Sequence, residues 1–179
     1  MRALVIRDAL AVVEAEGRVR TGDVVIVDGV VVDSPAPADA TVIDASDCVV
    51  TPGLVNAHHH LLQTAFRTLP GTRGIPMRDW LPAMASAYAA AGVDPELTGI
   101  AARAGLAEAL LSGVTTVADH HLTWPSGADT VGMARAAAAA AADLGARLAF
   151  VRGAARDDPQ EAALSAEAIA AALVDGCPG

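Results

Sequence analysis

The sequence predicts an α/β fold in two parts: a small β-sandwich over residues 1–52 and the N-terminal part of a (β/α)8 barrel over residues 53–179. Short β-branched runs separated by turn-forming residues predict the first part. Three alternations of an apolar strand with a helical pattern predict the second, because such alternation is typical of a parallel sheet. A complete barrel takes roughly 250 residues, so residues 53–179 have room for about three of its eight strand–helix units.

The N-terminal part contains short strand patterns joined by tight turns. Asp28–Gly29 lies between VVIV and VVVD, which is typical of a two-residue β-hairpin. The strands are too few to bury both faces of a sandwich by themselves. They are predicted over residues 3–6, 11–14, 24–27, 42–44 and 48–50.

The second part begins with a strand that leaves the Pro52–Gly53 turn and ends in three consecutive histidines. Residues 61 to about 78 are rich in glycine and proline, and GTRGIP at 71–76 shows neither helical nor strand periodicity, so a loop is expected there. Asp94 before Pro95 is typical of a capped helix start, and Gly113 is typical of a helix end. The other predicted elements are strands over residues 114–119 and 147–151, and helices over 77–90, 126–144 and from 158 to before 176.

Charge and composition restrict the partners of the chain. The formal net charge is −9, and an acidic surface disfavours binding to nucleic-acid phosphates. Cys48 and Cys177 form no C-x-x-C motif or disulfide framework, so a reduced, cytoplasmic protein is expected. Arg7 and Asp8 interrupt any apolar leader segment, and the alanine tract at 136–142 is far shorter than the roughly 20 apolar residues of a membrane span. We therefore expect neither nucleic acid nor a membrane as a partner.

Two of the histidines have the spacing of a metal site. Side chains alternate between the faces of a strand, so His58 and His60 are predicted to point to one side and His59 to the other. Two residues along a strand span roughly 6.6 Å, so two imidazoles can converge on one ion at a Zn–N distance of about 2.0–2.1 Å. A structural histidine pair is the alternative, but each buried ring would then need its own polar partner.

These residues also carry a family resemblance. PGLVNAHHH resembles the first barrel strand of the amidohydrolase superfamily, whose pattern contains H-x-H after a Pro-Gly turn. The extension HHHLLQTAFR resembles the branch that holds 8-oxoguanine deaminase, guanine deaminase and the triazine hydrolases. Asp79–Trp80–Leu81 and the run GVTTVADHHLTWP resemble the 8-oxoguanine deaminase group most closely.

The resemblance implies a metal-dependent hydrolase of C–N bonds, with His58 and His60 holding one divalent ion. Zinc is expected, with iron as the alternative, because imidazole suits several divalent metals. A catalytic zinc normally has three protein ligands and an open position for water. The resemblance implies that the remaining ligands and the acid/base glutamate lie beyond Gly179. We therefore expect a fragment that is inactive alone, while a homo-oligomer of the full-length protein stays open.

Three residues are candidates for contacting a small heterocyclic substrate. The amide of Gln63 can donate and accept hydrogen bonds at once, and the resemblance to guanine deaminases implies that it contacts the base. A solvated glutamine is the alternative. His121 ends the second barrel strand and is expected near the substrate mouth, or else as a backbone-bonded loop histidine. Trp124, in the loop that follows, is expected to line a pocket for a flat ring.

Four further residues receive structural interpretations. His59 and His120 face opposite to their neighbours along a strand, so packing or orientation of other groups is favoured over metal ligation. Arg67 is expected to pair with a carboxylate, with substrate contact as the alternative. Trp80 opens an apolar helix and is expected to belong to the core.

The leading hypothesis is deamination of an aromatic nitrogen heterocycle such as 8-oxoguanine or guanine. A triazine hydrolase and a hydrolase of cyclic amides or imidazolones are the alternatives within the superfamily. A lysine that bridges two metals would favour the cyclic-amide reaction, and the chain contains no lysine. The remaining alternatives are a truncated domain without turnover and a metal-storage module. The G-x-S-x-G, P-loop and cytidine-deaminase signatures are absent from the sequence.

Overall fold

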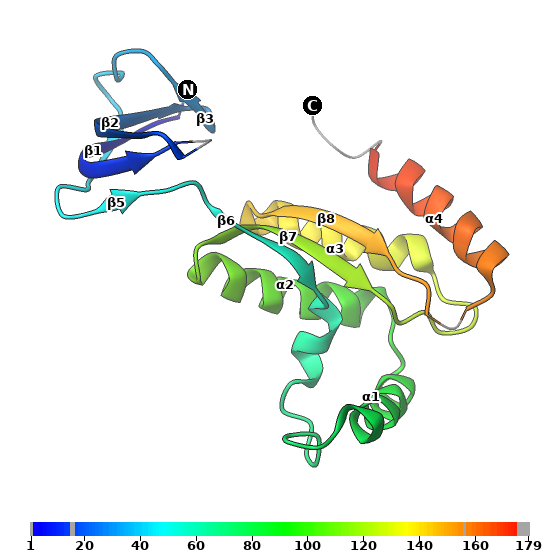
Figure 1. Ribbon diagram of the computed structural model, residues 1–179. Coiled ribbons are helices and arrows are strands. Elements are labelled where there is room, and N and C mark those ends of the chain that lie inside the picture. The colour runs from blue at the N-terminus through cyan, green and yellow to red at the C-terminus, as the bar shows by residue number, and fades with distance from the viewer. Residues whose placement is uncertain (1, 15–16, 156, 175–179) are drawn as a thin grey trace. The chain divides into compact units, whose positions relative to one another are not determined.

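The computed structural model describes residues 2–14, 17–155 and 157–174 (Figure 1). The chain forms two compact units, Met1–Gly53 and Leu54–Gly179, and each is described by itself. The division falls one residue after the boundary expected from the sequence. Both strands and helices are present, so the α/β class is confirmed.

The first unit is one five-stranded sheet. Its order is β3-β2-β1-β4, with β5 also paired to β1. β2 is antiparallel to β1 and β3, whereas β4 and β5 run parallel to β1. One buried cluster contains Ala9, Val12, Val24 and Ala45. The second layer of the predicted sandwich stays a prediction. The strands are β1 (Ala3–Val13), β2 (Val19–Val27), β3 (Val30–Val32), β4 (Thr41–Asp44) and β5 (Val49–Val50).

The prediction of two separate strands at residues 3–6 and 11–14 was wrong, because β1 is continuous across both. The pairing with β2 shifts register between Ile6 and Ala9, and Asp8 between them has a φ of 60°. Such an irregularity inserts extra residues without ending a strand. The hairpin prediction is confirmed: Asp28 and Gly29 have φ values of 49° and 84°, as a primed two-residue turn requires.

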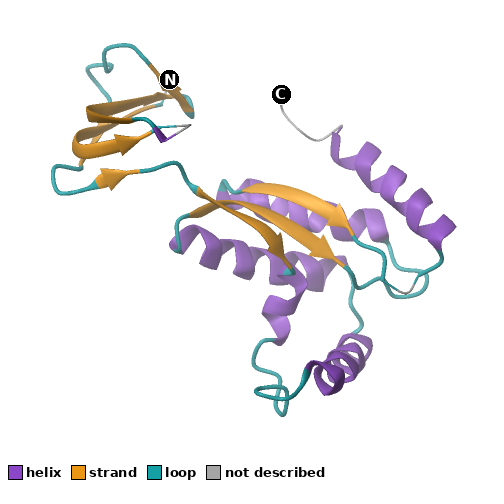
Figure 2. Cartoon of the chain, in the orientation of Figure 1, coloured by secondary structure: helices purple, strands orange, loops and turns teal. Residues whose placement is uncertain are grey.

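The second unit contains a parallel three-stranded sheet in the order β6-β7-β8. Figure 2 shows α2 and α3 against one face of this sheet. The strands are β6 (Leu54–His59), β7 (Val114–His121) and β8 (Arg147–Arg152). The helices are η2 (Leu61–Phe66), α1 (Met77–Ala91), α2 (Pro95–Leu111), α3 (Thr130–Leu144) and α4 (Pro159–Val174). Three strand–helix units are thus observed, while closure into a barrel stays a prediction.

Side-chain caps set the starts of α2 and α3. The Asp94 carboxylate accepts a hydrogen bond from the Leu97 backbone N–H at 2.8 Å, which confirms the predicted start of α2. The predicted start of α3 was four residues early, because Asp129 caps the helix through the Gly132 N–H at 2.7 Å. The expected loop at 61–78 was also partly wrong. Its first residues form the 3₁₀ helix η2, in which Leu61 and Leu62 are buried.

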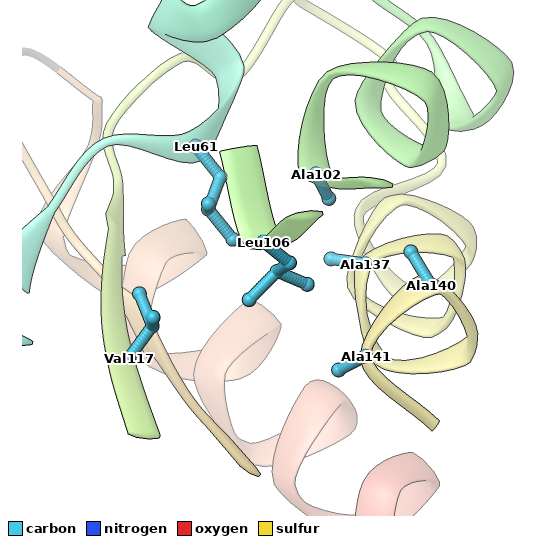
Figure 3. Close-up of a cluster of buried hydrophobic side chains, with 7 residues drawn as sticks. All are labelled: Leu61, Ala102, Leu106, Val117, Ala137, Ala140 and Ala141. Carbon is cyan, nitrogen blue, oxygen red and sulfur yellow. The ribbon is translucent and has the colours of Figure 1, made fainter. Parts of the chain in front are cut away.

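The core of the second unit is built from small side chains. One buried cluster joins β7, η2, α2 and α3 (Figure 3). Close packing of α2 on α3 requires small residues, since a Cβ on Gly99 would lie 3.3 Å from the Cβ of Ala136. No helix in the described part of the chain is long and apolar enough to cross a membrane. The cluster contains Leu61, Ala102, Leu106, Val117, Ala137, Ala140 and Ala141.

Candidate active site

Three histidine rings gather at the carboxyl ends of β6 and β7. His58 lies on β6 and His60 directly follows that strand, at the N-cap of η2. Their ring centroids are 4.9 Å apart and the rings are nearly perpendicular, at 86°. The ring of His120, on β7, lies 4.3 Å from that of His58 at an interplanar angle of 30°. The predicted pair therefore comes together, with a third imidazole tilted against one member.

A backbone hydrogen bond orients the ring of His60. Its Nδ1 lies 2.6 Å from the carbonyl oxygen of His120. A carbonyl can only accept, so this Nδ1 carries the hydrogen and Nε2 keeps its lone pair. Metal-binding histidines are held in this way, with one ring nitrogen donating to a carbonyl or carboxylate and the other free for the ion. The free Nε2 of the His60 ring is thus suited to bind a metal ion.

The described residues do not supply the remaining ligands of a complete metal site. Among the residues that the structure describes, no group of three or more His, Cys, Asp or Glu side chains could hold a metal ion. The ring of His120 lies on that of His58, and its Nε2 is 3.2 Å from the Ala57 carbonyl oxygen. That arrangement suits packing and orientation. The assignment of His58 and His60 as metal ligands stays a prediction.

The residues on either side of His120 point the other way, into the helix-covered face of the sheet. Asp119 and His121 are 1% and 2% exposed. The Asp119 carboxylate accepts a hydrogen bond from the Leu61 backbone N–H at 2.8 Å, which ties β7 to the turn after His60. Sequence reasoning gave Asp119 no role. Its position two residues before His121, on the same strand face, was the available signal.

Burial is the largest influence on the pKa values of Asp119 and His121. It raises the pKa of Asp119 to about 6 and lowers the pKa of His121 to about 4. His121 Nε2 lies 3.1 Å from the Thr123 carbonyl oxygen, so Nε2 carries the hydrogen of the neutral ring. Its Nδ1 lies 3.9 Å from Asp119 Oδ2. His121 lies in β7 rather than in a loop, it has this backbone bond and it also borders the cavity described next, so its role at the substrate mouth stays a prediction.

A cavity of about 860 Å³ lies beside the histidines. Gln63, His121 and Trp124, the three predicted substrate residues, all line it, as does His60. Their role in binding stays a prediction, but one cavity joins them. Ligand sites typically occupy about 300–1,000 Å³ and combine apolar walls with a few polar groups.

Two predictions about single residues can be decided in this region. Trp80 was expected in the core, but it is only partly buried and lines the cavity, because η2 and the following loop place the start of α1 beside it. The expected salt bridge of Arg67 is confirmed, with Glu108 at 2.5 Å. Its partner belongs to α2.

Comparisons with known proteins place the chain in context. A model of the Amidohydrolase family matches residues 49–175. The 8-oxoguanine deaminase of Pseudomonas aeruginosa is 41% identical over 128 residues, covering 68% of this chain and 28% of that protein. An isoxanthopterin deaminase from an unknown prokaryotic organism is 38% identical over 94 residues, covering 52% of this chain and 19% of that protein. The chain thus spans less than a third of these relatives.

Solved structures show the same likeness. An atrazine chlorohydrolase variant from Arthrobacter aurescens, complexed with zinc and atraton, superposes with a TM-score of 0.72 and 32% identity, covering 83% of this chain and 35% of that one. A guanine deaminase from Bradyrhizobium japonicum superposes with a TM-score of 0.66 over 96% of this chain and 41% of that one. At 17% identity, that second match bears on the fold alone.

Proposed function

We propose a function that starts from an established fact: this chain belongs to the amidohydrolase family. The proposed function is that the chain forms part of a metal-dependent site that deaminates an aromatic nitrogen heterocycle. The observation that carries the proposal is the shared cavity. His60, whose Nε2 is free for an ion, borders the same space as Gln63 and Trp124. A metal ligand, an amide and an indole around one space suit a flat, polar ring.

Each residue would contribute a separate part of the chemistry. A divalent ion held by His58 and His60 would supply Lewis-acid activation of water at neutral pH. The Gln63 amide would orient the ring, because its oxygen can accept from a ring N–H while its nitrogen donates to the adjacent carbonyl. Trp124 would provide a stacking surface for the ring. The acid/base glutamate and further ligands are proposed to lie beyond Gly179.

Oxidised guanine or guanine is the proposed substrate class. The similarity to a protein named 8-oxoguanine deaminase supports this choice, together with a cavity large enough for a bicyclic ring. Zinc is the proposed metal, supported by the atrazine chlorohydrolase complexed with zinc. That same structure favours a second candidate, hydrolytic removal of a substituent from a triazine ring.

The test is a substrate comparison with the complete natural protein. After its metal content has been measured, it would be assayed on 8-oxoguanine, guanine, isocytosine and triazines. We expect ammonia release from a purine substrate and one tightly bound divalent ion. Release of a triazine substituent alone would favour the second candidate, and activity on none of these compounds would remove the substrate proposal.

Gln63 offers a sharper test of ring recognition. Gln63→Leu keeps the approximate volume but removes both hydrogen-bonding groups, so kcat/KM on the preferred heterocycle should fall by about 10- to 100-fold. Metal content should stay unchanged, because Gln63 is not a proposed ligand. Arg103→Met, which alters only an exposed ion pair between α2 and α3, is the matched control. Equal kcat/KM in wild type and Gln63→Leu would contradict the assignment.

A further inference from the structure

The indole of Trp124 is held from several directions. It lies in the loop after β7 and lines the cavity. Its Nε1–H donates to the Gly153 carbonyl oxygen at 2.8 Å, and the His121 ring lies 4.6 Å from it. The partly buried indole also packs against the buried cluster that contains Met133. The indole of Trp124, which forms one wall of the cavity, is therefore held in place by groups that are not themselves proposed to react.

A charged side chain, that of Arg152, also contacts the indole of Trp124. Arg152 ends β8, and its guanidinium carbon lies 4.8 Å from the centroid of the Trp124 ring. Its side chain is only 7% exposed. The cavity lining includes Trp124 and Asp157 but does not include Arg152. The cation therefore contacts the indole from outside the cavity lining, while its ion-pair partner Asp157 is part of that lining.

Arg152 is itself fixed by three partners. It forms an ion pair with Asp157, donates to the Ser165 hydroxyl at 3.3 Å and donates to the Gly153 carbonyl oxygen at 3.0 Å. The carbonyl of Gly153 therefore accepts hydrogen bonds from both the indole and the guanidinium. A Cβ on Gly153 would also lie 3.0 Å from the His121 carbonyl oxygen, so the backbone there leaves little room for a larger residue.

We propose that Arg152 is a positioning residue that fixes the Trp124 indole as the stacking wall of the ligand cavity. The interpretation of that wall as a ring-binding surface rests on the proposed function; the positioning itself does not. A guanidinium can stack on an aromatic face and keep several hydrogen bonds at once, which an ammonium cannot match. A buried cation is costly to desolvate unless it is paired, and here Asp157, Ser165 and the Gly153 carbonyl pair it.

Tryptophan fluorescence tests the positioning without any assay of activity. The 179-residue chain has two tryptophans, so Trp80→Phe leaves Trp124 as its only one. In this background, Arg152→Met should shift the emission to longer wavelength and increase quenching by acrylamide, because the indole becomes mobile and more accessible. Arg152→Lys should give a smaller change. Arg103→Met should give none.

A kinetic comparison in the complete natural protein tests the consequence for the ligand. Arg152→Met should raise KM by about tenfold while kcat changes less than twofold, since a looser wall weakens ground-state and transition-state binding alike. Near-UV circular dichroism would show whether a variant is folded. If Arg152→Met does not fold, Arg152→Lys and Asp157→Asn supply the same comparison, and each should move the emission in the same direction.

The two parts can fail separately. Unchanged emission and quenching in folded Arg152 variants would overturn the positioning proposal, whatever the activity. A clear fluorescence change without turnover of any heterocycle would leave the positioning standing and would count against the proposed function. A fall in kcat at constant KM would contradict the role as a binding wall, because the lost interaction would then belong to the transition state.

Discussion

The two faces of β7 place neighbouring residues in opposite environments. Asp119 and His121 point into the helix-covered face and are almost completely buried, whereas His120 between them is partly exposed and stacks on His58. The alternation follows from strand geometry alone. The buried residues tie together the backbone beneath the cavity, and the exposed one lies beside the candidate ligands. Adjacent histidines in one sequence motif can therefore have different physical roles, and burial separates them.

The largest expected difference between the two faces is in stability. His121→Ala removes a fully buried ring that contacts Trp124 and Phe150, so the free energy of unfolding should fall by about 3 kcal/mol. His120→Ala removes a partly exposed ring and should cost less than about 1 kcal/mol. Urea unfolding of both variants checks the pair. Equal losses would mean that strand alternation does not separate the two histidines.

The pH dependence of stability sharpens the same comparison on the buried face. Burial raises the pKa of Asp119 to about 6 from 3.8, so its contribution to the free energy of unfolding is full below pH 3.8 and is lost as the pH rises through about 6. Burial lowers the pKa of His121 to about 4 from 6.5, so its contribution is full above pH 6.5 and is lost as the pH falls through about 4. Between about pH 4 and about pH 6, the contributions of Asp119 and His121 to the free energy of unfolding therefore change in opposite directions.

Asp119→Asn separates these trends. Asparagine keeps an oxygen that can accept from the Leu61 N–H, but it does not titrate. Between pH 7 and pH 4 the variant should therefore lose about 2 kcal/mol more unfolding free energy than the wild type, because only His121 still responds. Urea unfolding at a series of pH values measures this. Parallel curves for the two proteins would show that the carboxylate does not offset the histidine.

The sequence was sufficient wherever the signal was local. The H-x-H spacing, the Asp94 cap and the Asp28–Gly29 turn each depend on a few consecutive residues, and the structure contains all three geometries. The missed features depend on pairing between distant segments. The contact of Asp119 with Leu61 requires the parallel register of β6 and β7, in which His59 lies opposite Asp119.

The same limit explains the other errors. Asp8 interrupts the apolar pattern of β1, but pairing with β2 carries the strand past it. The six residues of η2 are too few for a helical period to be visible, and burial of Leu61 and Leu62 against other elements defines the turn. Trp80 could not be assigned to the cavity from the sequence, because that assignment requires the position of α1 in space. Tertiary contacts, rather than local propensity, decide each of these cases.

The smallest expected effect concerns the exposed face. His120→Ala should weaken retention of the proposed zinc ion by the complete natural protein about tenfold, because the ring that packs on His58 is lost. The carbonyl that holds His60 belongs to the backbone and remains. His120→Phe keeps a ring on His58 and should recover most of the affinity, whereas His60→Ala should release the ion. Competition with a chromophoric chelator measures all three variants. If His120→Ala releases zinc as completely as His60→Ala, then His120 binds the ion directly, and the distinction between ligand and support on this face is wrong.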